Sequence, residues 1–325
     1  MAILLVAVAL AYAGILLGVR AVGNRFEGGE AAEPVGSLEG RFADDNVEMQ
    51  YAGRTWSYRR RDLTNLLLIG VDWADGEAAA SERYAGQADF LLLLTIDRGN
   101  RTVSALQLDR DTIADVRILG PFGDFTGIRA TQICLSHAYG ETAEENCENT
   151  VWAVSRLLAN IPIDGYLALN MGGIAALNDA LGGVTVTLEE DFSQLDPQMT
   201  KGAALRLQGD QAEKFVRGRR DVGDGTNASR MRRQKAFIDA ARELLLQQMN
   251  ADMNCVGRLY DALEEHLTTN LQRGWLINKA YECREYQWKD TITPAGSHAV
   301  GEDGFMEFHA DADALNALLA ESFFE

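Results

Sequence analysis

Two continuous apolar runs in the first third of the chain predict the centre of a β-sheet. Residues 65–72 read NLLLIGVD and residues 90–97 read FLLLLTID. Short apolar runs of this kind, closed by Gly or Asp, are typical of strands that are buried on both faces. A tight turn at 98–100 then leads into a third predicted strand over 102–108. We expect these strands to form the core of the fold.

Helical and strand patterns alternate along the rest of the chain. The predicted helices run from Asn149 to Leu158 and over 171–181, 210–215, 230–248 and 311–323, with 252–286 predominantly helical. Further strands are predicted over 166–170 and 184–188, and a late hairpin over 291–298 and 305–309. Because helices and strands interleave, we expect an α/β (α+β) fold with a central mixed β-sheet flanked by helices.

The chain opens with an apolar run from Ala2 to Val19. At about 1.5 Å per residue, a run of this length nearly crosses a hydrocarbon layer of about 30 Å. We therefore expect one transmembrane helix over 1–20 and a tether with several Gly residues over 21–62. One domain should follow over 63–249, and the C-terminal segment 250–325 should complete it.

Two features bear on the side of the membrane that carries the domain, and they disagree. Arg20 and Arg25 follow the apolar run and no Lys or Arg precedes it, so the positive-inside rule places the domain in the cytoplasm. Four cysteines without a CxxC pair suit two disulfides outside the cell instead. Nearest-neighbour pairing gives Cys134–Cys147 and Cys255–Cys283, one of three connectivities, and four buried free thiols are the alternative. The scattered histidines disfavour a zinc site.

Charge excludes one class of function and singles out one segment. The formal net charge is −18 and the isoelectric point is near 4.7, which argues against nucleic-acid binding. Within this acidic chain, residues 217–235 read RGRRDVGDGTNASRMRRQK, with seven basic residues and two acidic ones. Arg217 and Arg219 alternate, so on an extended strand they would point to one side.

The second half of this basic segment has a helical period. Arg230, Arg233 and Gln234 lie on the same stripe as the apolar positions that follow, from Phe237 to Leu245. Inward arginines are costly unless an anion or a carboxylate meets them, and the first turn of a helix favours phosphate. Asp221 and Asp224 are too few to neutralise the arginines, which favours an anion site over an internal ion-pair network.

Carboxylates at strand ends suggest a metal site. Asp72 ends the first strand and Asp89 begins the second, so antiparallel neighbours would bring the two together, with Asp111 as a third candidate. Mg²⁺ takes one or two carboxylates together with substrate phosphate oxygens. The alternative is that these aspartates only cap strands. Combined with the inward arginines, the pattern favours metal-assisted phosphoryl chemistry. The P-loop, GxGxxG and GxSxG motifs are absent.

The order of these motifs resembles the LytR-CpsA-Psr family of membrane-anchored cell-wall glycopolymer transferases. The resemblance covers roughly Leu63 to Met249, with a weaker echo over 293–308. The motifs that carry it are LLLIGVD (66–72), GQADFLLLLTID (86–97), LDRDT (108–112), IPIDGYLALN (161–170), NDALGGV (178–184), GDQAEKFVRGRR (209–220) and GDGTNASRMRRQ (223–234). Several motifs in the same order make the resemblance specific.

The resemblance implies a set of site residues. Asp72 and Asp89 would hold Mg²⁺ or Mn²⁺. The pyrophosphate of the substrate would be bound by Arg110, Arg217, Arg219, Arg230, Arg233 and Gln234, supported by Asp224, with Arg110, Asp111, Arg217 and Arg219 as the catalytic candidates. Three positions depart from the family pattern: Gln87 replaces an arginine, Asp109 replaces the proline of P-R-D, and Cys134 replaces an asparagine.

The resemblance also implies a function. Such a protein would bind a polyprenyl-pyrophosphate-linked glycan in an apolar groove and transfer the glycan to peptidoglycan outside the cytoplasm, anchored to the cell membrane by one helix. A non-catalytic protein that only holds polyprenyl pyrophosphate is one alternative, since Gln87 removes a positive charge. A cell-envelope regulator is the other.

Overall fold

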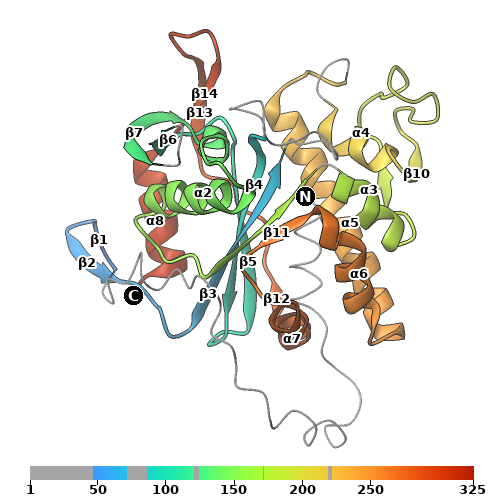
Figure 1. The fold of residues 1–325 in the computed structure, drawn as a ribbon, viewed down its shortest axis with the longest axis horizontal. Helices are drawn as coiled ribbons and strands as arrows, with labels where there is room; N and C mark the ends of the chain where they lie inside the picture. The colour runs from blue at the N-terminus through green and yellow to red at the C-terminus, as the bar shows by residue number, and fades with distance from the viewer. Residues whose placement is uncertain (1–46, 72–85, 121–123, 171, 219–221) are drawn as a thin grey trace, which may run out of the picture.

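The computed structural model describes residues 47–71, 86–120, 124–170, 172–218 and 222–325. Within these residues, a six-stranded mixed sheet forms the centre of the fold, as the sequence predicted (Figure 1). Its strands, in spatial order, are β11 (Leu267–Thr269), β8 (Gly165–Leu169), β3 (Leu63–Val71), β4 (Ala88–Asp97), β5 (Thr102–Leu108) and β12 (Gln287–Trp288). The strands β3, β4 and β5 are antiparallel neighbours, β8 is parallel to β3, and β12 is parallel to β5.

The continuous apolar runs are explained by burial on both faces of this sheet. Successive side chains of a strand point to opposite faces, so Leu66 and Leu68 join one core while Leu67 and Ile69 join another. The first core is covered by α3 (Gly172–Ala180), α4 (Gln211–Arg217), α5 (Asn227–Ala251), α6 (Cys255–Leu263) and α7 (Arg273–Cys283). The second is covered by α2 (Ala143–Leu157) and α8 (Ala312–Phe323), on the opposite side of the sheet (Figure 1).

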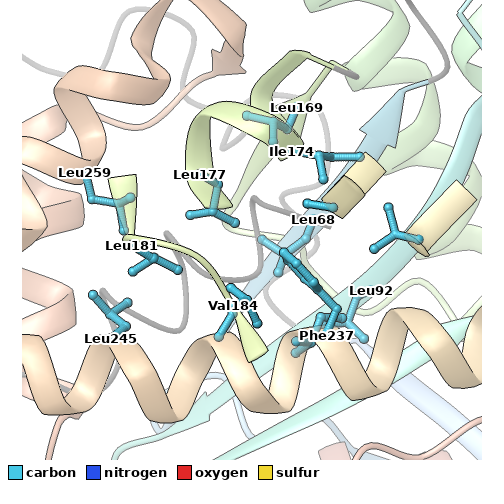
Figure 2. Close-up of a cluster of buried hydrophobic side chains, with 14 of the residues drawn as sticks. Leu68, Leu92, Leu169, Ile174, Leu177, Leu181, Val184, Phe237, Leu245 and Leu259 are labelled. Carbon is cyan, nitrogen blue, oxygen red and sulfur yellow. The ribbon is translucent and has the colours of Figure 1, made fainter. Parts of the chain in front are cut away.

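The first core lies between the sheet and α5, and some of its side chains also line the candidate site. Figure 2 shows Phe237 and Leu245 projecting from α5 towards Val184 and Leu181, with Leu68 of the sheet nearby. All of these side chains are buried. The apolar period that predicted α5 therefore marks its buried face.

Four two-stranded sheets surround the central one. They pair β1 (Glu48–Tyr51) with β2 (Arg54–Ser57), β6 (Ile113–Leu119) with β7 (Phe125–Gln132), β9 (Thr185–Thr187) with β10 (Ala204–Arg206), and β13 (Gly296–Val300) with β14 (Met306–Ala310). The last pair confirms the late hairpin. Two 3₁₀ helices, η2 (Ile133–Ala138) and η3 (Glu264–His266), complete the described elements.

Local differences from the predictions have identifiable causes. Part of the predicted tether, 48–57, is the β1–β2 hairpin, whose Met49 is buried in the second core. The helix predicted from Asn149 begins earlier, at Ala143, because the Thr142 side chain caps it by accepting a hydrogen bond from the Glu145 N–H. The predominantly helical segment 252–286 also contains β11, which adds to the edge of the sheet beside β8.

The predicted transmembrane run, 2–19, lies outside the described residues. Among the residues that are described, none of the helices combines the length and the apolar character needed to cross a bilayer.

The predicted disulfides are wrong, because all four cysteines are buried free thiols. The sulfur of Cys134 lies 3.4 Å from Nη2 of Arg110, and the sulfur of Cys147 lies 3.6 Å from Nε2 of His137. The two remaining thiols lie in the first apolar core. An even cysteine count sets no geometry, and a disulfide needs a specific separation and direction of the two Cβ atoms. The cysteines therefore no longer indicate which side of the membrane carries the domain.

His137 should make the stability of the fold depend on pH. Its ring is buried, its Nδ1 lies 2.6 Å from the Gly86 carbonyl, and burial lowers its pKa from 6.5 to about 4. The unfolded chain therefore takes up a proton below pH 6.5 while the folded chain does not, so stability is lost as the pH falls from 6.5 towards 4. We expect this histidine to account for a loss of about 3 kcal/mol over that range.

The measurement is urea unfolding at pH 7 and at pH 4.5, on the wild type and on His137→Gln. Because other groups titrate in the same range, the relevant quantity is the difference between the two proteins. Equal losses of stability in both would contradict the prediction.

Candidate functional site

Asp89 lies at the start of β4, beside the end of β3. Val71, the last residue of β3, pairs with Ala88, and the register shifts between Gly70 and Val71. The antiparallel neighbours predicted from the sequence are therefore confirmed. Asp72, the partner proposed for Asp89, lies outside the described residues.

Two arginines from distant segments share the Asp89 carboxylate. Oδ1 of Asp89 accepts a hydrogen bond from Nη1 of Arg110, and Oδ2 accepts one from Nη1 of Arg230 at 3.1 Å. Arg110 follows β5 and Arg230 lies in the first turns of α5. The start of β4, the end of β5 and the beginning of α5 therefore meet at this carboxylate.

Arg110 makes further contacts that fix its guanidinium. Its Nη2 donates to Oε1 of Gln87 at 2.6 Å and to the sulfur of Cys134 at 3.4 Å. Its Nε donates to Oδ1 of Asp111 at 3.2 Å, and Asp111 is almost fully buried. The Arg110–Asp111 pair is therefore not an exposed surface ion pair. Gln87 and Cys134, two of the departures from the family pattern, both contact this arginine.

Arg230 is oriented by a residue that the sequence argument missed. Oδ1 of Asn227 accepts hydrogen bonds from Nη2 and Nε of Arg230, at 2.6 and 3.1 Å, and Nδ2 of Asn227 donates to Oδ1 of Asp109 at 2.6 Å. Asn227 is the first residue of α5, three residues before Arg230. That spacing puts the two on one face of the helix and was a usable signal.

The arginines meet the apolar core at a small hollow. Its lining includes Asp89, Arg217, Arg230 and Gln234 together with apolar side chains from β3, β4, β8, α3 and α4: Val71, Phe90, Leu169, Ile174 and Val216. Two arginines and several apolar side chains therefore line the same hollow. The volume of the hollow is about 30 Å³, so a ligand with an anionic end and an apolar body would bind there only if the apolar side chains moved apart.

Arg217 reaches this hollow from a helix and not from an extended strand, so the alternation with Arg219 does not apply to it. It is the last residue of α4, and its Nη1 donates to Oε1 of Glu213 one turn earlier, an i,i+4 pair. Arg219 lies outside the described residues.

The helical phasing of α5 is confirmed. Arg230, Arg233 and Gln234 are buried, whereas the side chain of Arg232 is 61% exposed and that of Lys235 is 41% exposed. The buried face of α5 therefore carries the polar residues that the pattern selected.

Arg233 makes a separate set of contacts on the same helix face. Its guanidinium donates to Oε2 of Glu190, to the Gly218 carbonyl and, at 3.1 Å, to the Phe215 carbonyl. It also lies over the ring of Phe192 at 5.4 Å. These contacts join α5 to the C-terminal end of α4, and Arg233 does not line the hollow.

The sequence predicted too few carboxylates for an internal ion-pair network, and the structure corrects this. Asp89 and Glu190 come from remote segments and pair with Arg230 and Arg233. The internal network and the candidate anion site coexist on one helix face.

Asp224 organises the start of α5. Its Oδ1 accepts from the N–H of Thr226 at 2.9 Å and from the Thr226 hydroxyl at 2.7 Å, and these bonds lower its pKa. Thr226 in turn caps the helix by accepting from the Ser229 N–H. Gly223 is required nearby: its φ is +57°, and a Cβ there would come within 2.5 Å of the Glu190 carboxylate. Asp224 thus shapes the turn that leads into α5.

The described residues contain no group of three or more His, Cys, Asp or Glu side chains placed to hold a metal ion. Of the two predicted metal ligands, only Asp89 is described, and both of its oxygens accept from arginines.

The fold and the site together define an α/β protein in which buried arginines meet an apolar core. The model of the LytR_cpsA_psr family matches residues 37–321, and the chain belongs to that family.

Curated relatives agree with this membership, and a solved structure shows the same fold. The chain is 31% identical over 212 residues to the polyisoprenyl-teichoic acid–peptidoglycan teichoic acid transferase TagU of Halalkalibacterium halodurans, which covers 65% of this chain and 62% of that protein. It is 26% identical over 268 residues to TagU of Bacillus cereus, covering 80% and 79%. The crystal structure of protein gbs0355 from Streptococcus agalactiae superposes with a TM-score of 0.64 at 22% identity, covering 81% and 88%, and shows the same fold.

Proposed function

We propose that this protein is a membrane-anchored phosphotransferase that moves a glycopolymer from a polyprenyl pyrophosphate carrier to peptidoglycan. The observation that carries the proposal is the hollow in which Arg217 and Arg230 meet apolar side chains of the first core. The names of the TagU relatives support the same substrate class. The body would lie outside the cytoplasm, where peptidoglycan is, with the apolar run 2–19 as its anchor.

The charged and apolar parts of the donor would bind to different parts of this hollow. Arg217 and Arg230, which line the hollow, would hold the pyrophosphate together with Arg110, which shares the Asp89 carboxylate with Arg230. Arg219 is a further proposed ligand. The polyprenyl chain would enter the apolar layer beside Phe90, Leu169 and Ile174. Guanidinium groups bind phosphate oxygens in pairs, and the arrangement is held in place before the substrate arrives.

In the proposed reaction, a sugar hydroxyl of peptidoglycan attacks the phosphorus that carries the glycan. One O–P bond forms, the bond from that phosphorus to the bridging oxygen breaks, and polyprenyl phosphate leaves with the electron pair. Arg110 and Arg230 would stabilise the charge that develops on the bridging oxygen. Asp111, beside Arg110, would accept the hydroxyl proton.

A divalent ion, Mg²⁺ or Mn²⁺, would be held by Asp89 together with Asp72. Carboxylate oxygens suit Mg²⁺, which also accepts phosphate oxygens from a substrate. Because both oxygens of Asp89 accept from Arg110 and Arg230, the ion would have to displace at least one of these arginines, which would turn to the pyrophosphate. When bound, the ion would neutralise charge on the pyrophosphate.

A transfer assay tests the proposed function. The full chain in detergent is given a polyprenyl-pyrophosphate-linked glycan and peptidoglycan, and phosphodiester-linked product is measured. Product formation supports the proposal. Lipid binding without transfer would favour the non-catalytic alternative. Gln87 is the residue to test in that case, because it replaces the arginine of the family pattern and its Oε1 accepts a hydrogen bond from Arg110. In that case Gln87→Arg, which restores the residue of the family pattern, is the variant to compare.

Removal of metal should abolish transfer. Dialysis against EDTA is expected to lower the rate by about 100-fold or more, because a bound ion supplies several kcal/mol of charge stabilisation. Added Mg²⁺ should restore the rate, and EDTA saturated with Mg²⁺ beforehand is the control. An unchanged rate after complete chelation would rule out the metal.

A further inference from the structure

A second opening has Arg110 in its lining. It is a groove of about 960 Å³, and its lining includes Gln87, Arg110 and Asp111. This volume is at the upper end of the range for ligand sites, roughly 300–1,000 Å³. Arg110 lines the groove and Arg230 lines the hollow, and the two are joined through the Asp89 carboxylate. The two openings therefore reach one cluster of charges.

The β13–β14 hairpin forms one wall of this groove and is tied to the residues around Arg110. Nε2 of His298 lies 3.0 Å from Oδ2 of Asp109, and the N–H of Phe308 donates to the Asp111 carbonyl at 2.8 Å. Asp109 is buried, and its other oxygen accepts from Asn227, which orients Arg230. The wall is therefore fixed relative to the arginines.

The β6–β7 hairpin supplies the facing part of the lining, and it is connected to the same wall. Arg129 and Gln132 of β7 line the groove, and Nε2 of Gln132 donates to the Met306 carbonyl at 2.6 Å. The groove is thus bounded by two hairpins that contact each other.

The chemistry of the outer lining is mixed. It contains an exposed aromatic ring, Phe305, beside the carboxylates of Glu302, Asp303 and Glu307 and the guanidinium of Arg129. An aromatic face next to carboxylates suits an uncharged polyhydroxyl ligand, because hydroxyl groups donate to carboxylates and the apolar face of a sugar ring packs on the aromatic ring. The same carboxylates would repel an anionic membrane surface.

We propose that this groove binds the acceptor, a saccharide strand of peptidoglycan, and presents one of its hydroxyl groups to the charge cluster from the side opposite the lipid. This inference rests on the proposed function. It adds the direction of approach: the donor occupies the hollow beside Arg230, and the acceptor lies along the β13–β14 hairpin and reaches Arg110 and Asp111.

The test measures binding of a soluble, uncrosslinked peptidoglycan oligosaccharide to the full chain in detergent by titration calorimetry. Phe305→Ala is expected to weaken binding by about 10-fold, as is usual when an aromatic anchor is removed. Glu302→Gln should weaken it in the same direction. Phe125→Ala is the matched control: it also removes an exposed phenylalanine from a hairpin, 60% exposed against 64% for Phe305, but Phe125 does not line the groove.

Two further measurements on the same proteins distinguish a failure of the proposed function from a failure of the groove proposal. Retention of polyprenyl pyrophosphate, measured by mass spectrometry of organic extracts, should be equal in all of them; its absence from the wild type would contradict the proposed function and not the groove. Binding to anionic vesicles should also be unchanged.

The groove proposal is overturned if the wild type does not bind the oligosaccharide, or if Phe305→Ala and Phe125→Ala behave alike. It is also overturned if Phe305→Ala lowers vesicle binding and leaves saccharide binding intact, because the hairpin would then be a membrane contact.

Discussion

The full chain carrying Arg230→Ala is expected to lose polyprenyl pyrophosphate that the wild type retains during purification. Arg230 is buried, lines the hollow, and shares Asp89 with Arg110. Removing one member of a buried charge cluster costs 2–5 kcal/mol of binding, so we expect a loss in affinity of about 100-fold or more. Mass spectrometry of organic extracts measures the retained lipid.

Two variants make this result interpretable. Arg230→Lys keeps the charge and removes the planar fork, so it should fold and still bind the lipid weakly. Arg232→Ala, two residues away on the exposed face, should retain the lipid, because Nη2 of Arg232 lies 3.9 Å from Oε1 of Glu190, an exposed contact worth about 0–1 kcal/mol. Equal lipid content in the wild type and Arg230→Ala would show that the arginine cluster is an internal ion-pair network and does not bind the lipid.

Arg233→Ala is expected to lower the stability of the fold by about 3–5 kcal/mol, the usual cost of leaving one partner of a buried ion pair alone. The substitution leaves Glu190 without its main cationic partner and removes the hydrogen bonds to the carbonyls of Phe215 and Gly218. Urea unfolding of the wild type and the variant measures the effect, again with Arg232→Ala as the control.

A double variant separates the ion pair from the rest of the network. Glu190→Gln combined with Arg233→Ala should be less destabilised than the two single effects added together, because no buried carboxylate is then left unpaired. If Arg233→Ala is as stable as the wild type but loses the lipid, Arg233 binds pyrophosphate as the family resemblance implied.

Residues close together along the chain could be placed from the sequence. The period of α5 put Arg230, Arg233 and Gln234 on its buried face, because a helix of 3.6 residues per turn superposes positions three and four apart. The ends of β3 and β4 were placed together for a similar reason, since antiparallel neighbours joined by one loop bring the end of one strand beside the start of the next.

Pairings between remote segments could not be placed in this way. Glu190 pairs with Arg233 across 43 residues, and Asp109 meets His298 across 189, and neither contact leaves a periodic trace in the sequence. The cysteines failed for the same reason: their number suggested disulfides, but the fold directs the Cys134 sulfur to Arg110 and the Cys147 sulfur to His137.

What the sequence determined by itself was the set of buried faces, the mixed sheet and the family motifs that mark the arginine cluster. These follow from local periodicity, which the backbone geometry of one element is enough to set. Only the tertiary structure determined which arginines line the hollow and which stabilise the fold through buried ion pairs and hydrogen bonds. That division depends on where Asp89 and Glu190 arrive in space, and their positions are set by packing of the sheet against α4 and α5, not by their distance along the chain.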